Sequence, residues 1–171
     1  KMADKFLQVG TSGNLEEKEA TVIGGSAENA GDIVALNEDG KLDDTVMPVG
    51  IGAETKVIEA SENLSANDVV NIYDDAGAVK VRKADATDDT KPAHGYVKEA
   101  VTSGSQAVVY TDGYLPGTGL TVGSKYFLSA ETPGAVTTTP PSDTGNIAQV
   151  IGIAVSTTDI KFEPLIPIRR A

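Results

Sequence analysis

A single histidine limits the acid–base chemistry that this chain can perform. His94 stands in the segment KPAHGYV, two residues after Pro92 and at the start of a run of strand-forming residues. A serine-hydrolase triad would have to use this imidazole, but the chain has no G-x-S-x-G segment to supply the nucleophile. Cysteine is absent, so thiolate chemistry, disulfides and Cys-ligated metals are excluded, and a zinc site would need carboxylates almost alone. We therefore expect His94 to have a surface or turn role.

Acidic clusters are the next candidates, because carboxylates can bind calcium. They are NEDG (37–40), YDDAG (73–77) and ADATDDT (84–90). None of them has the D-x-[DN]-x-[DN]-G-x5-E spacing of a calcium loop, and Asp and Asn before Gly are ordinary turn formers. The sequence thus predicts structural turns at these clusters, and no metal-ligating residue.

Two further patterns could support catalysis or phosphate binding. Paired carboxylates cleave glycosides, and the chain has 25 acidic residues, but it has no Trp and only 5 Tyr to form a sugar platform. The Gly-rich segment GYLPGTGLTVG (113–123) lacks both the Lys of a phosphate-binding loop and a following helix, so we predict a loop there. We expect no catalytic or cofactor-binding residue, and a protein that is not an enzyme.

The net charge narrows the classes of partner. The chain carries 14 basic against 25 acidic residues, a formal charge of −11. Such a surface repels phosphate backbones and anionic membranes, so neither nucleic acid nor a membrane is an expected partner. No apolar run approaches the roughly 18 residues of a membrane span, and the N-terminus lacks the apolar core of a secretory signal.

The composition and the strand pattern predict an all-β fold. Val, Ala, Thr and Gly dominate, aromatic residues make up only 5%, and 18 Gly and 8 Pro imply many turns. From residue 55 onward, short β-branched segments are separated by turn residues at intervals typical of a β-barrel or β-sandwich. These segments are TKVIEAS, DVVNIYD, AVKVRKA, HGYVKEAV, QAVVYTDGYL, SKYFLSA, GAVTTTP, AQVIGIAVS and DIKFEPLIPI.

The region from 51 to 171 also contains a duplication. Three landmarks recur in order at an offset of 56 or 57 residues: Leu at 64 and 120, GAV at 77 and 134, and Gly at 95 and 152. We predict two similar β-units, about 55–110 and 111–171, that bury their apolar faces against each other. The Gly at each turn should have positive φ, and the Gly in each last strand should permit a bulge or close backbone approach.

Residues 1–50 differ from the rest of the chain. Short apolar clusters alternate with Gly, Asn, Ser and acidic residues, and each cluster is too small to form a core. One interpretation is a mobile tail; the other, which we favour, is an extended arm and linker that becomes ordered by laying these clusters on a partner. Within it, AGDIVALNEDGKL (30–42) is predicted to form a strand-turn-strand element. The candidate interface residues are Phe6, Leu7, Val9, Ile33, Val34, Leu36, Val46 and Met47.

Two segments resemble proteins of tailed-phage virions. GGSAENAGDIVALNEDGKLDDTVMPVGIG (24–52) is similar to a linker phrase common in such proteins. The segment 123–164 resembles a module, Y-[FY]-L-S…PG-x-[IV]-T…P…G…Q-x-[IV]-G-x-A-x-S, of capsid decoration proteins, head fibres and tail fibres. Small decoration proteins of the best-known type lack an arm of this length, a departure from the family pattern.

This resemblance implies a non-enzymatic homo-oligomer, most often a homotrimer, on the outside of a virion. The size of the chain favours a capsid decoration or head-fibre protein that binds the major capsid protein and stabilises the capsid, after synthesis in the cytoplasm of a host bacterium. The alternative is a short tail fibre or receptor-binding adaptor that contacts host-surface glycans through Tyr73, Tyr96 and Tyr114. A glycan-degrading fibre domain is the third hypothesis.

Overall fold

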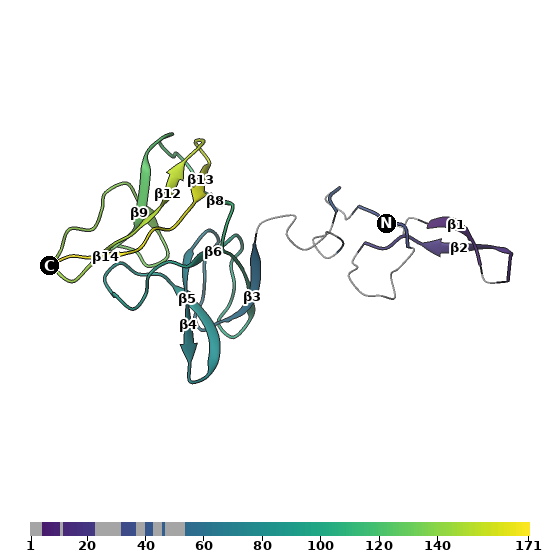
Figure 1. Ribbon diagram of the computed structural model, residues 1–171, viewed down its shortest axis with the longest axis horizontal. Coiled ribbons are helices and arrows are strands. Elements are labelled where there is room, and N and C mark those ends of the chain that lie inside the picture. The colour runs from purple at the N-terminus through teal and green to yellow at the C-terminus, as the bar shows by residue number, and fades with distance from the viewer. Residues whose placement is uncertain (1–4, 11, 23–31, 37–39, 43–45, 47–53) are drawn as a thin grey trace. The chain divides into compact units, whose positions relative to one another are not determined.

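The computed structural model describes residues 5–10, 12–22, 32–36, 40–42, 46 and 54–171. The chain separates into two compact units, Lys1–Gly52 and Ala53–Ala171 (Figure 1). All named elements in the described residues are strands, which confirms the predicted all-β class. Within the same residues, no helix has the length and apolar character needed to cross a membrane.

The first unit contains an antiparallel hairpin. Strand β1 (Lys5–Val9) pairs with β2 (Leu15–Glu19). Between them Gly13 has a φ of +80°, a conformation that suits a residue without a Cβ, and the Gly10 N–H donates to the Asn14 carbonyl at 2.8 Å. The extended arm predicted over 1–50 is not confirmed, since the described residues of this region include a hairpin of β1 and β2.

The predicted strand-turn-strand element at 30–42 lies partly outside the described residues. In its described part, Val34 forms an isolated parallel bridge with Thr21. The Thr21 N–H donates to the Ile33 carbonyl and the Ala35 N–H donates to the Thr21 carbonyl, each at 2.9 Å. The segment therefore pairs with the chain that follows β2.

The second unit begins with a closed barrel. Its strands are β3 (Thr55–Ala60), β4 (Val69–Asp75), β5 (Ala78–Lys83), β6 (Gly95–Val97) and β7 (Gln106–Tyr110), in the order β3-β5-β4-β6-β7. The β3–β5 pair is parallel and the other pairs are antiparallel. The barrel interior is filled by small and branched side chains, namely Ile58, Ala60, Leu64, Val70, Val81, Val97, Ala107 and Val109.

An open sheet follows the barrel. It contains β8 (Tyr114–Pro116), β9 (Lys125–Leu128), β10 (Val136–Thr137), β12 (Val150–Ala154) and β13 (Asp159–Phe162), in the order β10-β9-β12-β13-β8. A separate pair joins β11 (Ile147–Ala148) to β14 (Ile168–Arg169). Because β8 lies within 113–123, the prediction of a loop over that whole segment is wrong.

The two sheets share one order of connected strands. Starting from β5, the order of hydrogen-bonded strands in the barrel is β5-β4-β6-β7-β3. The order in the open sheet is β10-β9-β12-β13-β8, so strands that correspond in chain order occupy the same positions in the two sheets. The difference is closure: Glu59 and Ala60 of β3 pair with Lys80 and Val81 of β5, and no such pairing joins β8 to β10 in the described structure. The recurring landmarks thus fall in matching places of two sheets, one closed and one open.

The landmark glycines behave as the duplication predicts. Gly77, in the β4–β5 turn, has a φ of +93°, and Gly134, between β9 and β10, has a φ of +83°. A Cβ on Gly95 would lie 2.8 Å from the Tyr110 carbonyl oxygen, and a Cβ on Gly152 would lie 1.9 Å from that of Lys161. The register of β12 against β9 also shifts between Val150 and Gly152. Positive φ and close backbone approach are confirmed, and the register shift is found at Gly152. The predicted place of the two strand glycines in the last strand of each unit was wrong, because β7 follows Gly95 and β13 follows Gly152.

Side chains that alternate along the barrel strands contribute to two cores, one inside the barrel and one between the barrel and the open sheet. Val70 and Val97 point into the barrel, whereas their neighbours Val69 and Tyr96 belong to the cluster that the barrel shares with the open sheet. The open sheet contributes Leu115, Tyr126, Leu128, Ile147, Ile151, Ala154, Ile160 and Phe162 to this cluster. The predicted burial of two apolar faces against each other is confirmed.

Candidate partner-binding surface

One face of the first unit's hairpin carries exposed apolar side chains. Alternation along β1 places Leu7 and Val9 on one face, and the pairing places Leu15 opposite Val9. Their exposed fractions are 68% for Leu7, 69% for Val9 and 71% for Leu15. We call these three residues the hairpin face. Single exposed apolar residues are common on protein surfaces, but an adjacent group of three on one small sheet is typical of an interaction site.

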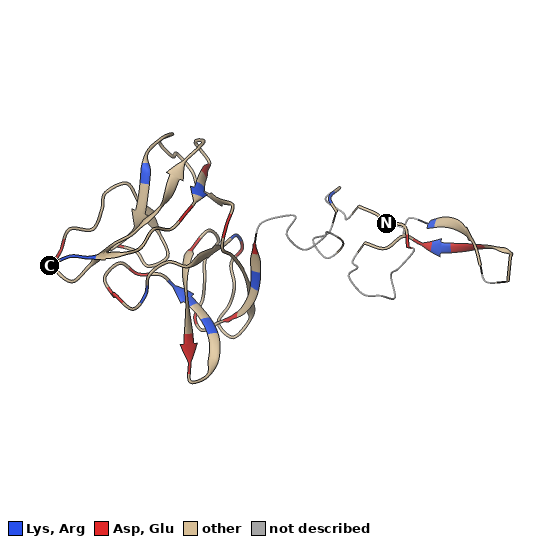
Figure 2. Ribbon diagram, in the orientation of Figure 1, with Lys and Arg blue, Asp and Glu red and all other residues tan. Residues whose placement is uncertain are grey.

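Charged residues adjoin the hairpin face along the same strands. Glu17 lies opposite Leu7, and Glu19 lies opposite Lys5, so these side chains share the face. Figure 2 colours a basic position on β1 and both acidic and basic positions on β2. The Lys5 ammonium lies 2.7 Å from a Glu17 carboxylate oxygen, and this hydrogen bond raises the pKa of Lys5. A complementary partner surface would therefore combine an apolar groove with a rim that tolerates acidic groups.

A second exposed group follows the Thr21–Val34 bridge. Asp32 is engaged there by an ion pair with Lys18 and by a hydrogen bond from the Thr21 hydroxyl at 2.8 Å. These contacts hold the segment close to β2, while Ile33, Val34 and Leu36 remain exposed. The bridge thus presents apolar side chains without burying them within its own unit.

The candidate interface residues from the sequence fall into three groups. Leu7, Val9, Ile33, Val34 and Leu36 are exposed, as a contact surface requires. Phe6 and Val46 are half-buried, and Met47 lies outside the described residues. Whether any of them contacts a partner stays a prediction.

Two exposed apolar residues of the first unit were missed by the sequence reasoning. Leu15 and Leu42 each stand alone among polar neighbours, so neither belongs to an apolar cluster in the sequence. The signal for Leu15 was the turn-forming GTSGN between two short segments, which predicts a hairpin and hence a partner for Val9.

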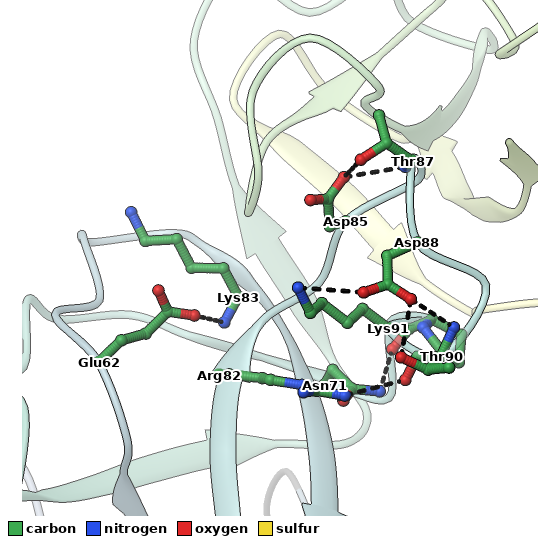
Figure 3. A network of polar contacts seen from close by, with 10 residues as sticks. Glu62, Asn71, Arg82, Lys83, Asp85, Thr87, Asp88, Thr90 and Lys91 are labelled. Atoms are coloured by element: carbon green, nitrogen blue, oxygen red, sulfur yellow. Dashed lines mark hydrogen bonds and ion pairs between the residues drawn. The ribbon is translucent and has the colours of Figure 1, made fainter.

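The acidic cluster at 84–90 forms turns in the second unit. One carboxylate oxygen of Asp85 accepts hydrogen bonds from the Thr87 N–H at 2.9 Å and hydroxyl at 2.8 Å, and Asp88 accepts the equivalent pair from Thr90 at 3.0 and 2.7 Å (Figure 3). The other Asp88 oxygen lies 3.1 Å from the Lys91 ammonium. The Thr90 and Lys91 contacts hold the pKa of Asp88 at about 2. Turn formation at this cluster agrees with the prediction.

The same loop is fixed to the barrel by a buried amide. Asn71 donates to the Pro92 carbonyl at 2.8 Å and accepts from the Arg82 guanidinium at 3.0 Å (Figure 3). Arg82 also donates to the Thr90 carbonyl at 3.1 Å and lies over the Tyr73 ring, 4.2 Å from its centroid. Asn71 and Arg82 therefore have structural roles.

The tyrosines proposed for glycan contact lie in different environments. Tyr114 is exposed and Tyr73 is half-buried beneath Arg82, but Tyr96 is fully buried. The Tyr96 hydroxyl donates to the Tyr114 carbonyl at 3.0 Å, and its ring stacks on Tyr110 with centroids 5.3 Å apart. Exposure of Tyr96 was a wrong prediction, because GYV forms a central strand that is covered on both faces.

His94 has the expected place at the surface. Its ring nitrogen Nδ1 accepts a hydrogen bond from the Ile72 N–H at 3.1 Å. The imidazole therefore provides a hydrogen-bond acceptor for a backbone N–H of β4. Among the residues that the structure describes, no three His, Asp or Glu side chains are grouped as metal ligands would be.

Comparison with family models, with curated proteins and with solved structures finds no match to this chain.

Proposed function

We propose that this protein is a non-enzymatic component of a tailed-phage virion that coats the outside of the assembled capsid. It binds the major capsid protein through its first unit, acts as a homo-oligomer, most simply a homotrimer, and is made in the cytoplasm of the bacterial host. The observation that carries the proposal is the exposed hairpin face of Leu7, Val9 and Leu15 in a unit separate from the β-domain. The resemblance of 24–52 and 123–164 to virion modules is the reason for proposing a tailed-phage virion as the particle.

The physics of a small hairpin supports attachment through this unit. An isolated two-stranded sheet is marginally stable in water, and it gains stability when its apolar face is covered by another surface. Burying three aliphatic side chains contributes several kcal/mol, at about 1.5–3 kcal/mol for each. A capsid groove beside the hairpin would supply that cover.

Stabilisation of the capsid would follow from mass action. A protein that binds the assembled lattice and not the free subunits stabilises the lattice by its binding free energy. Three copies in one oligomer would bind with avidity, so that each contact could be weak. The charge of −11 disfavours self-association of coated particles, which suits an outer layer.

A short tail fibre or receptor-binding adaptor is the second candidate. The observation that favours it is exposed Tyr114, with the Lys161 ammonium 5.8 Å from its ring centroid and Asp112 2.8 Å from that ammonium. An aromatic ring beside hydrogen-bonding groups can serve as a platform for a sugar.

Location on the particle separates these candidates. Virions labelled with an antibody against residues 54–171 should carry label over the capsid in electron micrographs. Label confined to the tail tip would support the fibre instead, and absence of label from purified virions would contradict both.

A further inference from the structure

A cavity of about 300 Å³ lies where the open sheet meets the acidic loop of the barrel. Thr87 lines it from the barrel, and residues 129–131, 137, 139–143 and 146 line it from the open sheet and its loops. Main-chain bonds fix this junction: the Ile147 N–H donates to the Ala86 carbonyl at 2.8 Å, and the Ala86 N–H donates to the Ser129 carbonyl at 3.3 Å. The two walls of the cavity are therefore held together by the fold.

The cavity lies beside β10, a strand at the edge of the open sheet. In the barrel, Lys80 of β5 pairs with Glu59 of β3. The position 57 residues after Lys80 is Thr137 of β10, which has no corresponding strand beside it and instead lines the cavity. The chain after β10 then runs through Pro140 and Pro141 around the opening.

The loop formed by residues 139–146, which lies after β10, is held in place by hydrogen bonds. The Arg170 guanidinium donates to the Pro141 carbonyl at 3.0 Å, and the Arg170 N–H donates to the Asn146 carbonyl at 2.8 Å. The Gly145 N–H donates in turn to the Arg170 carbonyl at 3.0 Å. A loop held at both ends in this way can present side chains with little ordering cost.

The side chains that face the cavity suit a neutral ligand with many hydroxyl groups. Glu131, Asp143 and Asn146 line it, and in the described structure no hydrogen bond or ion pair engages their side chains. Thr and Ser hydroxyls add donors and acceptors, and two proline rings add apolar surface. No Lys or Arg is among the lining residues, so two carboxylates disfavour an anionic ligand.

We propose that this cavity, between Thr87, Thr137 and the 139–146 loop, binds a neutral saccharide. Asp143 and Glu131 accept hydrogen bonds from sugar hydroxyls, and the Asn146 amide can both donate and accept. The volume is at the small end of ligand sites, which fits one or two sugar residues. This inference concerns the β-domain and does not depend on how the first unit attaches.

Saturation-transfer NMR on the full chain tests the proposal. The probes are neutral trisaccharides of glucose, of galactose and of N-acetylglucosamine, with sialyllactose and trilysine as the anionic and cationic comparisons. We expect at least one neutral trisaccharide to bind, and Asp143→Ala and Asn146→Ala each to weaken that binding about tenfold. Glu163→Ala removes an exposed carboxylate elsewhere and should leave binding unchanged.

Three results would overturn the proposal. The first is no transfer to any neutral trisaccharide, and the second is transfer that both cavity substitutions leave intact. The third is binding of trilysine or sialyllactose alone. Because Asp143 is exposed and Asn146 is half-buried at the surface, unchanged circular dichroism and melting temperature should accompany every variant, so that a loss of binding is a loss at the site.

Discussion

The side chain of Gln149 pairs with the backbone of Ala93 as a neighbouring β-strand would. Its Oε1 accepts from the Ala93 N–H at 2.7 Å, and its Nε2 donates to the Ala93 carbonyl at 3.0 Å and to the Leu165 carbonyl at 3.1 Å. Gln149 lies between β11 and β12, and Ala93 comes just before β6. One buried amide thus links the open sheet, the barrel and the C-terminal segment.

Replacing this amide should destabilise the second unit strongly. Gln149→Leu keeps the volume but leaves the Ala93 N–H and carbonyl buried without partners, at about 1–3 kcal/mol for each group. We expect the free energy of unfolding in urea to fall by about 2–6 kcal/mol. Gln106→Leu is the matched control, because Gln106 is exposed on β7 and should change stability by less than about 0.5 kcal/mol. Equal effects of the two substitutions would show that the pairing with Ala93 contributes nothing.

The landmark glycines should differ in their tolerance of a methyl group. Gly152→Ala places a Cβ 1.9 Å from the Lys161 carbonyl oxygen, whereas at Gly95 the nearest atom is a Val109 methyl at 2.6 Å, with the Tyr110 carbonyl oxygen at 2.8 Å. A side-chain methyl can move more easily than a paired strand, so Gly152→Ala should lower the melting temperature further than Gly95→Ala. Thermal unfolding of both variants checks this order, and the reverse order would contradict close approach at β12.

Lowering the pH should show how much the ionised Asp88 carboxylate contributes to stability. Its pKa falls from an ordinary 3.8 to about 2, first through the Thr90 hydroxyl, then through the Thr90 N–H and Lys91. A lowered pKa contributes stability above pH 3.8 that is lost as the pH falls toward 2. Asp88→Asn keeps an oxygen for the turn and removes the charge. It should cost about 0.5–1 kcal/mol at neutral pH, because the carboxylate is partly screened by solvent.

The cost of Asp88→Asn should shrink as the pH falls from 3.8 toward 2, where about half of the wild-type carboxylate is protonated, and it should disappear at still lower pH. Urea unfolding at neutral pH and at this acidic pH measures both values. A difference that persists unchanged in acid would show that the substitution acts through the shape of the turn.

Tyr96 should respond to alkali. Burial raises its pKa from 10.0 to about 12, with smaller contributions from Tyr110 and Asp112. The raised pKa contributes stability that is present below pH 10.0 and lost as the pH approaches 12. Tyr96→Phe removes the hydroxyl bond to the Tyr114 carbonyl and should cost about 1 kcal/mol at neutral pH. In an absorbance titration it should also remove the last tyrosinate step, and a late step that survives would contradict this assignment.

Local patterns in the sequence predicted much of the β-domain. The β-branched segments, the Ala76–Gly77 turn and the recurring glycines depend on neighbours in the chain, so their type could be read from residue order alone. The close approach at Gly152 was also predictable, because a small residue inside a strand has few other reasons to be there.

Features that depend on distant pairing could not be predicted in this way. Closure of the barrel rests on the parallel contact of Glu59 with Lys80, and nothing near either residue indicates it. Tyr96 was predicted to be exposed, but packing of the open sheet against the barrel buries it, and nothing next to it in the chain indicates that packing. The cavity beside Thr87 and Asn146 likewise requires backbone bonds between segments far apart in the chain.

Binding to capsids tests the central claim, that the first unit attaches this protein to the particle. The measurement is co-sedimentation of the full chain with expanded capsids of the phage that the proposed function assigns it to. Leu7→Ser/Val9→Ser/Leu15→Ser makes the hairpin face polar. Val57→Ser/Val108→Ser is the matched control, because these cross-strand neighbours are exposed on the barrel. We expect the hairpin variant, and deletion of 1–50, to weaken binding more than about tenfold, since several kcal/mol of apolar burial would be lost, and the barrel variant to bind normally. Undiminished binding by both the hairpin variant and the deletion would contradict the account.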